Sequence, residues 1–198
     1  MKKILILLIL LLTGCNKYTE LNELAIIKSI GIEKKDNYTL YAEIITDIKD
    51  NEPITEISKV TDSNINNLFN KIKLQVNKEI YFSHIDLIIL DFNLKNNDYD
   101  NLIKYFLNHH EFRNDFLTIL SSDMKNVLDN SQYDEIENLI ITNKESKTII
   151  KKTFEKLMQE YLDNKEFTLS NITYQDKVMF NGNYQYKDNE LKEIKWKK

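Results

Sequence analysis

The chain has 198 residues, a hydrophobic fraction of 42% and a formal net charge of −4 at pH 7. Length and apolar content suffice for one domain of ordinary size with a packed core. The acidic balance argues against nucleic-acid binding, and the low content of glycine and proline argues against a disordered chain. A single cysteine excludes an intramolecular disulfide.

The first fifteen residues have the layout of a bacterial secretory signal. Two lysines precede an unbroken run of Ile and Leu over residues 4–12, which is shorter than the ~20 apolar residues of a transmembrane helix. We expect residues 1–14 to be a signal peptide and Cys15 to be acylated; the alternative is a buried N-terminal element that ends in cysteine. The residues that match a lipobox are Leu12, Thr13, Gly14 and Cys15.

The predicted anchor sets the expected location. A diacylglyceryl group on Cys15 carries two acyl chains, and two chains hold a protein stably where one gives only marginal membrane binding. We therefore expect a globular domain tethered to the outer face of the cytoplasmic membrane.

Alternation and turn chemistry predict three strands followed by a helix. Residues 25–33 and 38–48 are rich in β-branched and aromatic side chains, and a Lys-Asp-Asn turn joins them into a hairpin. Residues 54–60 alternate as a shorter strand. Residues 63–77 carry apolar side chains at i, i+3, i+4 and i+7, which predicts an amphipathic helix.

The middle of the chain alternates between strands and helices. Residues 80–82 and 85–90 form an apolar run that is typical of a buried central strand. A helix over 99–107, a strand over 116–120 and a short helix over 123–128 follow.

Residues 131–145 are ambiguous, and residues 147–162 form an amphipathic helix by their spacing. Three strands are predicted last, over residues 167–174, 177–186 and 191–196. The order of elements predicts an α+β (mixed α/β) fold. It has a mixed sheet with an N-terminal hairpin, helices that cover it, and C-terminal antiparallel strands.

The titratable residues form no recognisable catalytic motif. Neither a Gly-rich phosphate loop nor a G-x-S-x-G or H-E-x-x-H pattern is present. His109 and His110 are adjacent, so they do not share a helix face and are interpreted as a solvated helix end. His84 and Asp86 could act as a general-base pair or form an ordinary hydrogen bond. We expect no catalytic residue, no cofactor and no metal site.

Three features are candidates for contacts with partners. Arg113 is the only arginine in the chain and suits bidentate recognition; the alternative is a surface ion pair, which contributes little. His84 is a second candidate interaction residue. Lysines around Trp196 could contact lipid headgroups or keep a solvated edge strand from aggregating.

Several segments share their order and spacing with one protein family. The first is Cys15 followed by E-L-N-E-L-A-I-I and G-I-E-K within residues 20–34. The second, I-Y-F-S-H-I-D-L-I-I-L over residues 80–90, is similar to the family pattern L-Y-x-x-H-x-x-x-I-I-I. The third is H-E-F-R and the following strand within residues 110–120, and residues 178–191 match more weakly. Together they resemble the C-subunit lipoproteins of bacterial spore germinant receptors, the Ger(x)C family.

The chain departs from this family in three ways. Tyr18 and Thr19 stand where tryptophan and arginines are usual, and Asp91 replaces a glycine. Family members are longer, and this chain ends near the hairpin that would open their later domains. We therefore expect residues 15–145 to form an N-terminal α/β domain of the germination-lipoprotein type. Residues 146–198 would form a helix plus β-hairpin that could be the remnant of a second domain.

The resemblance implies a non-enzymatic subunit of a germinant receptor. Such lipoproteins lie on the outer face of the inner spore membrane with membrane-embedded A and B subunits, and they are required for the response to nutrient germinants. Two alternatives remain open from the residues alone. One is a solute-binding or sensor lipoprotein, and the other is an exported hydrolase that uses His84 and Asp86.

Overall fold

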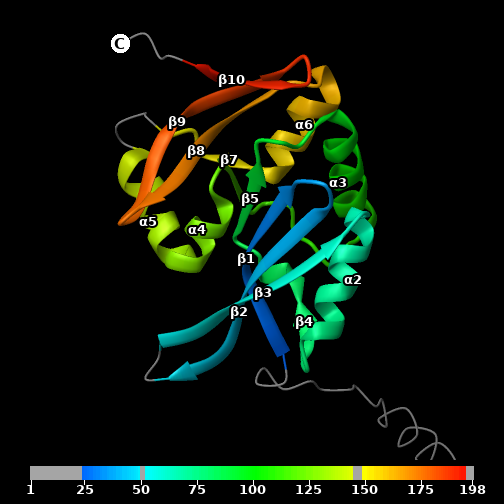
Figure 1. The fold of residues 1–198 in the computed structure, drawn as a ribbon, viewed down its shortest axis with the longest axis vertical. Helices are drawn as coiled ribbons and strands as arrows, with labels where there is room; N and C mark the ends of the chain where they lie inside the picture. The colour runs from blue at the N-terminus through cyan, green and yellow to red at the C-terminus, as the bar shows by residue number, and fades with distance from the viewer. Residues whose placement is uncertain (1–23, 50–51, 145–148, 195–198) are drawn as a thin grey trace, which may run out of the picture.

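The structure is a computed structural model that describes residues 24–49, 52–144 and 149–194. It shows a mixed sheet with helices on both faces, which confirms the predicted fold class (Figure 1). The strands are β1 (Leu24–Lys34), β2 (Tyr38–Lys49), β3 (Glu52–Asp62), β4 (Glu79–Tyr81), β5 (Leu87–Asp91), β6 (Leu117–Ser121), β7 (Lys152–Thr153), β8 (Phe167–Gln175), β9 (Lys177–Lys187) and β10 (Glu190–Ile194). The helices are α2 (Ile65–Gln75), α3 (Asn96–Asn108), α4 (Met124–Asn130), α5 (Tyr133–Lys144) and α6 (Phe154–Asn164).

The sheet has a parallel centre and antiparallel edges. Its strand order is β10-β9-β8-β6-β5-β1-β2-β3, with β4 paired to β1 and β7 paired to β6. Strands β1, β5, β6 and β8 run parallel to one another, whereas β1-β2-β3 and β8-β9-β10 are antiparallel meanders. The predicted hairpins therefore form the two edges of the sheet. Strands from both sides of residue 145 join it, and the division of the chain at that residue stays a prediction.

Helices cover both faces because the central strand is apolar on both. All five residues of β5 are buried: Ile88 and Leu90 pack with α2, α3 and α6, and Leu87 and Ile89 pack with α4 and α5. This division follows the alternation of side chains along a strand. Gly31 lets α4 approach β1, since a Cβ there would lie only 2.6 Å from the Met124 sulfur.

Three predicted elements differ in the structure. The apolar run over residues 80–90 is interrupted by a 3₁₀ turn at Phe82–His84 that separates β4 from β5. The ambiguous residues 131–145 contain α5. The helix predicted to begin at residue 147 begins at Phe154, because the Thr153 hydroxyl accepts the Lys156 amide as an N-cap.

The start of α2 is held by an acidic side chain that precedes it. Asp62 accepts the backbone amide of Asn64 at 2.9 Å and the amide group of Asn67 at 3.2 Å, and it pairs with Lys71 at 2.7 Å. The hydrogen bond from Lys71 and the backbone bond from Asn64 lower the pKa of Asp62 to about 2. The carboxylate form therefore stabilises the folded state.

Replacing Asp62 with asparagine should lower stability at neutral pH and lose this effect in acid. A carboxyl group with a depressed folded pKa stabilises above its unfolded pKa of about 4, and this contribution disappears as the pH falls towards about 2. Urea denaturation at several pH values should show the wild type and the variant converging below about pH 4. Asp36→Asn, which removes an equal charge from an exposed turn, is the control. A pH-independent difference, or an equal effect of Asp36→Asn, would contradict the assignment.

Candidate functional site

An apolar groove lies at the end of the sheet where the described chain begins. Leu24 and Ile26 are half-buried. The residues that alternate with them on β1 point into the core beneath α2. On the face of Leu24 and Ile26, α4 packs only farther along the strand, at Gly31. Ile48 on β2 is 62% exposed. The groove has a volume of about 300 Å³. Its lining residues are Leu24, Ile26, Ile45, Thr46, Asp47, Ile48 and Lys78.

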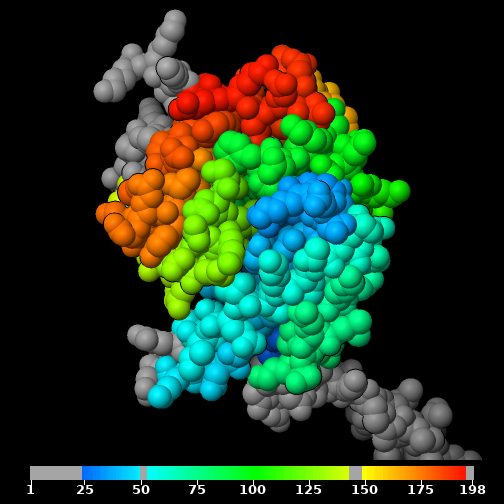
Figure 2. Space-filling view, viewed as in Figure 1, coloured from blue at the N-terminus to red at the C-terminus, as the bar shows by residue number. Residues whose placement is uncertain are grey.

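The apolar groove belongs to one pole of the molecule. The start of β1, the end of β2 and the start of β3 lie at the lower end of the fold, and β10 lies at the upper end (Figures 1 and 2). Ile54 on β3, 44% exposed, adds a second apolar side chain to the projecting hairpin. Exposed large apolar side chains gathered at one end of a domain are a feature of interaction surfaces.

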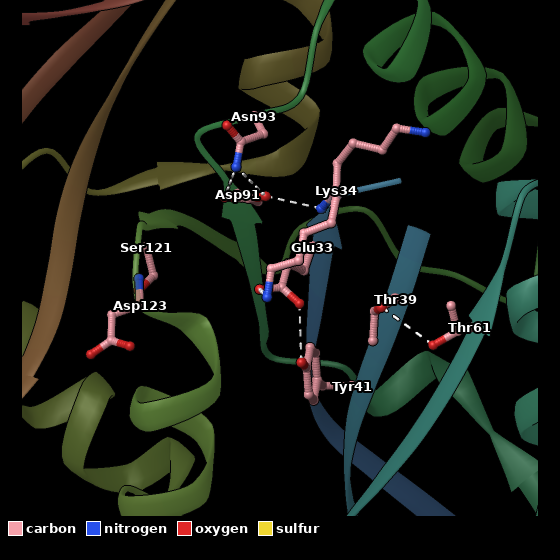
Figure 3. A network of polar contacts seen from close by, with 10 residues as sticks. Glu33, Lys34, Thr39, Tyr41, Thr61, Asp91, Asn93, Ser121 and Asp123 are labelled. Carbon is pink, nitrogen blue, oxygen red and sulfur yellow. Dashed lines mark hydrogen bonds and ion pairs between the residues drawn. The ribbon is translucent and has the colours of Figure 1, made fainter. Parts of the chain in front are cut away.

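Polar side chains meet at the carboxyl edge of the parallel strands (Figure 3). Asp91, at the end of β5, accepts the backbone amide of Lys34 at 2.9 Å and the Asn93 side chain at 3.2 Å. Tyr41 donates to Glu33 at 3.1 Å, and burial together with that carboxylate raises the pKa of Tyr41. This edge binds ligands in many α/β proteins. Here the carboxylates serve local donors, so the network fixes the ends of β1 and β5.

Arg113 lies on the surface in an ion pair. Its guanidinium contacts the Asp115 carboxylate at 2.7 Å, and the two side chains are 60% and 53% exposed. Such an exposed pair contributes little to stability. The role of Arg113 in contact with a partner stays a prediction.

His84 and Asp86 do not form the expected hydrogen-bonded pair. Asp86 binds Lys28 of β1 at 2.5 Å, and the imidazole of His84 lies against the Tyr81 ring at a centroid distance of 5.1 Å. Lys28, which binds Asp86 in place of His84, is 58 residues away in sequence and adjacent in the sheet. The pair proposed for a hydrolase is therefore wrong, and the role of His84 in interactions stays a prediction.

The remaining sequence candidates are placed as follows. His109 is fixed by a 2.8 Å contact between its Nδ1 and the Tyr105 carbonyl, and His110 is exposed. Within the described ranges, no group of three potential ligands lies close enough to hold a metal ion. No helix in the described part of the chain is long and apolar enough to cross a membrane. The lipobox residues, Cys15 and Trp196 lie outside the described residues.

Sequence reasoning missed a polar pocket between α2 and α3. Its α3 side contains Asn101, Lys104 and Asn108, which are spaced so that they share one helix face. The sequence alone shows that these three residues share a helix face. The pocket also requires the start of α2 to lie opposite that face, and tertiary packing sets this arrangement.

Comparison with known proteins places the chain in a family. The family model described as "Spore germination protein N-terminal domain" matches residues 17–174. The chain is 29% identical over 101 residues to "Spore germination protein KC" of Bacillus subtilis (strain 168). This alignment covers 44% of the chain and 25% of that relative, so the chain spans about a quarter of the relative's length. No solved structure matches. The resemblance noted from sequence motifs is confirmed, and the chain belongs to the family of the spore germination protein N-terminal domain.

Proposed function

We propose that this protein is a lipid-anchored, non-catalytic subunit of a germinant-receptor-type complex. It would lie on the outer face of the cytoplasmic membrane, which is the inner membrane of a spore, beside integral-membrane subunits of A and B type. The observation that carries the proposal is the family match over residues 17–174, which begins two residues after the lipobox cysteine. Acylation of Cys15 would supply the membrane attachment.

The position of the apolar groove supports attachment at this pole. Leu24 follows Cys15 by nine residues, and nine extended residues span at most about 30 Å. An acyl anchor on Cys15 therefore keeps the groove near the lipid surface. The net negative charge disfavours a domain that lies flat on an anionic bilayer. We infer an end-on orientation in which the exposed Ile48 and Ile54 face the membrane and β10 points away from it.

A structural role for the polar clusters supports the non-catalytic assignment. Asp86 is neutralised by Lys28, and Asp91 accepts a backbone amide at the end of β5. Neither carboxylate is paired with a histidine in the described residues. A general base needs such groups to converge on a reacting atom.

Affinity purification from spore membranes tests the proposal. A tag after Lys198 would stand at the end of the chain remote in sequence from Cys15. After detergent solubilisation, we expect a multi-span membrane protein and a second membrane protein with a cytosolic domain to co-purify in constant ratio. Purification from an untagged strain is the control. Recovery of the tagged chain alone would overturn the proposal.

A further inference from the structure

The polar pocket lies between the first turn of α2 and one face of α3. Its volume is about 440 Å³. Asn101, Lys104, Tyr105 and Asn108 recur at i, i+3, i+4 and i+7 of α3, so their side chains line one wall together. Asn66 lies in the facing first turn of α2. The polar pocket is thus built by two successive helices that pack against each other.

The polar pocket has a positive lining in an acidic protein. None of its lining residues is Asp or Glu, and Asp62, whose carboxylate holds the start of α2, is paired with Lys71 at 2.7 Å. Lys104 makes no ion pair or hydrogen bond within residues 24–49, 52–144 and 149–194. Its ammonium group is therefore available to a ligand.

Neighbouring carboxylates are already used by other groups. Asp62 pairs with Lys71, Asp98 accepts the hydroxyl of Tyr38, and Asp100 pairs with Lys165 at 2.6 Å. The two lysines offset the charges of Asp62 and Asp100, and the Tyr38 hydroxyl satisfies the buried Asp98 without changing its charge.

Tyr105 supplies a hydroxyl that has no hydrogen-bond partner among the described residues. The residue is only 4% exposed, and its ring is stacked on Phe69 at 4.4 Å and on His109 at 4.0 Å between centroids. The hydroxyl of Tyr105 forms no hydrogen bond with the rest of the described structure. The hydroxyl oxygen is not among the fully buried polar atoms, so it can be reached from the pocket. Since Tyr105 lines the polar pocket, a bound molecule can serve as that partner.

His109 completes the wall at the end of α3. Its Nδ1 lies 2.8 Å from the Tyr105 carbonyl and thereby occupies one of the free carbonyls at the negative end of the helix. The repulsion that this helix end would exert on an anion is reduced.

We propose that the polar pocket binds a small anion that carries a carboxylate or phosphate group. The Lys104 ammonium meets the negative charge, and the Tyr105 hydroxyl donates a hydrogen bond. The amides of Asn66, Asn101 and Asn108 bind the remaining polar atoms. This inference goes beyond receptor membership and depends on neither the anchor nor the partner subunits.

Calorimetric titration of the detergent-solubilised full-length protein tests the site. The probes are sodium phosphate and sodium succinate, each compared with sodium chloride at equal ionic strength. We expect at least one probe to bind with a Kd of about 1 mM or tighter, and the better probe identifies the anionic group. Absence of binding by both probes would overturn the proposal.

Three variants locate the binding. Lys104→Gln should weaken it by roughly tenfold or more, because a charge-assisted contact is lost. Tyr105→Phe keeps the stacked ring, so a weaker Kd in a variant that stays folded reports the hydroxyl. Lys125→Gln, on the opposite face of the sheet in α4, removes the same charge and should bind like the wild type. Equal affinities of the Lys104→Gln and Lys125→Gln proteins would contradict the assignment.

Discussion

Replacing Phe106 with alanine should lower the free energy of unfolding by about 3–5 kcal/mol. Phe106 of α3 is 1% exposed and joins three elements, with ring centroids 5.8 Å from Phe69 of α2, 4.8 Å from Phe154 of α6 and 4.7 Å from Phe112. Truncation leaves a cavity that these rings cannot all move to fill. The loss is a large part of the roughly 5–15 kcal/mol that stabilises a typical domain.

Urea denaturation followed by circular dichroism measures this effect. The matched control is Leu107→Ala, one position along the same helix, where the side chain is 50% exposed. A substitution at this solvent-facing position should cost far less, because little of the side chain is removed from a packed environment. Equal destabilisation by Phe106→Ala and Leu107→Ala would show that the aromatic cluster does not hold α2, α3 and α6 on the sheet.

The second large effect is expected from Cys15→Ala, which removes the thiol that the proposed anchor requires. The wild-type protein should incorporate labelled fatty acid and lack residues 1–14 in its mature form. The variant should incorporate no label and should not have the mature mass. A single acyl chain gives only marginal membrane binding, with an association constant of about 10⁴ M⁻¹. A variant that carries no acyl chain therefore has no stable attachment.

Mass spectrometry and membrane fractionation together provide the readout. Thr19→Ala changes the segment after the lipobox without touching the acylated cysteine, and it should be labelled and cleaved like the wild type. A Cys15→Ala protein that stays membrane-bound with unchanged mature size would disprove the lipoprotein proposal.

The parts of the fold that were predictable are those with local signals. The run Leu87–Leu90 identifies a central strand because both of its faces are buried, and such strands are apolar throughout. The β-branched and aromatic residues of β1 and β2, together with the Lys-Asp-Asn turn between them, identify the N-terminal hairpin. These signals require no knowledge of distant partners.

The boundary of α6 shows where periodicity misleads. Ile150 and Phe154 fit a helical spacing, yet the buried residues Ile149 and Phe154 pack in different cores on opposite faces of the sheet. The amide of Ile150 donates to the Ser170 hydroxyl at 2.7 Å, and Lys152 pairs with β6. Contacts with other strands therefore keep residues 149–152 out of the helix, which begins only after the cap at Thr153.

The sites were less predictable because they depend on pairing between distant segments. Sequence proximity suggested a pair between His84 and Asp86, but the parallel pairing of β1 and β5 gives Asp86 the ammonium of Lys28. The polar pocket likewise needs the turn before α2 to face α3. Local spacing shows which residues share a helix face, and it does not show what lies opposite them.

Membership in a membrane receptor complex is the central claim, and the composition of the affinity-purified complex tests it most directly. Quantitative mass spectrometry of the tagged protein from solubilised spore membranes should find two integral-membrane partners, of A and B type. Their ratio to this chain should be the same in independent preparations. If the chain is recovered with no membrane protein above the level of the untagged control, the proposed function is contradicted.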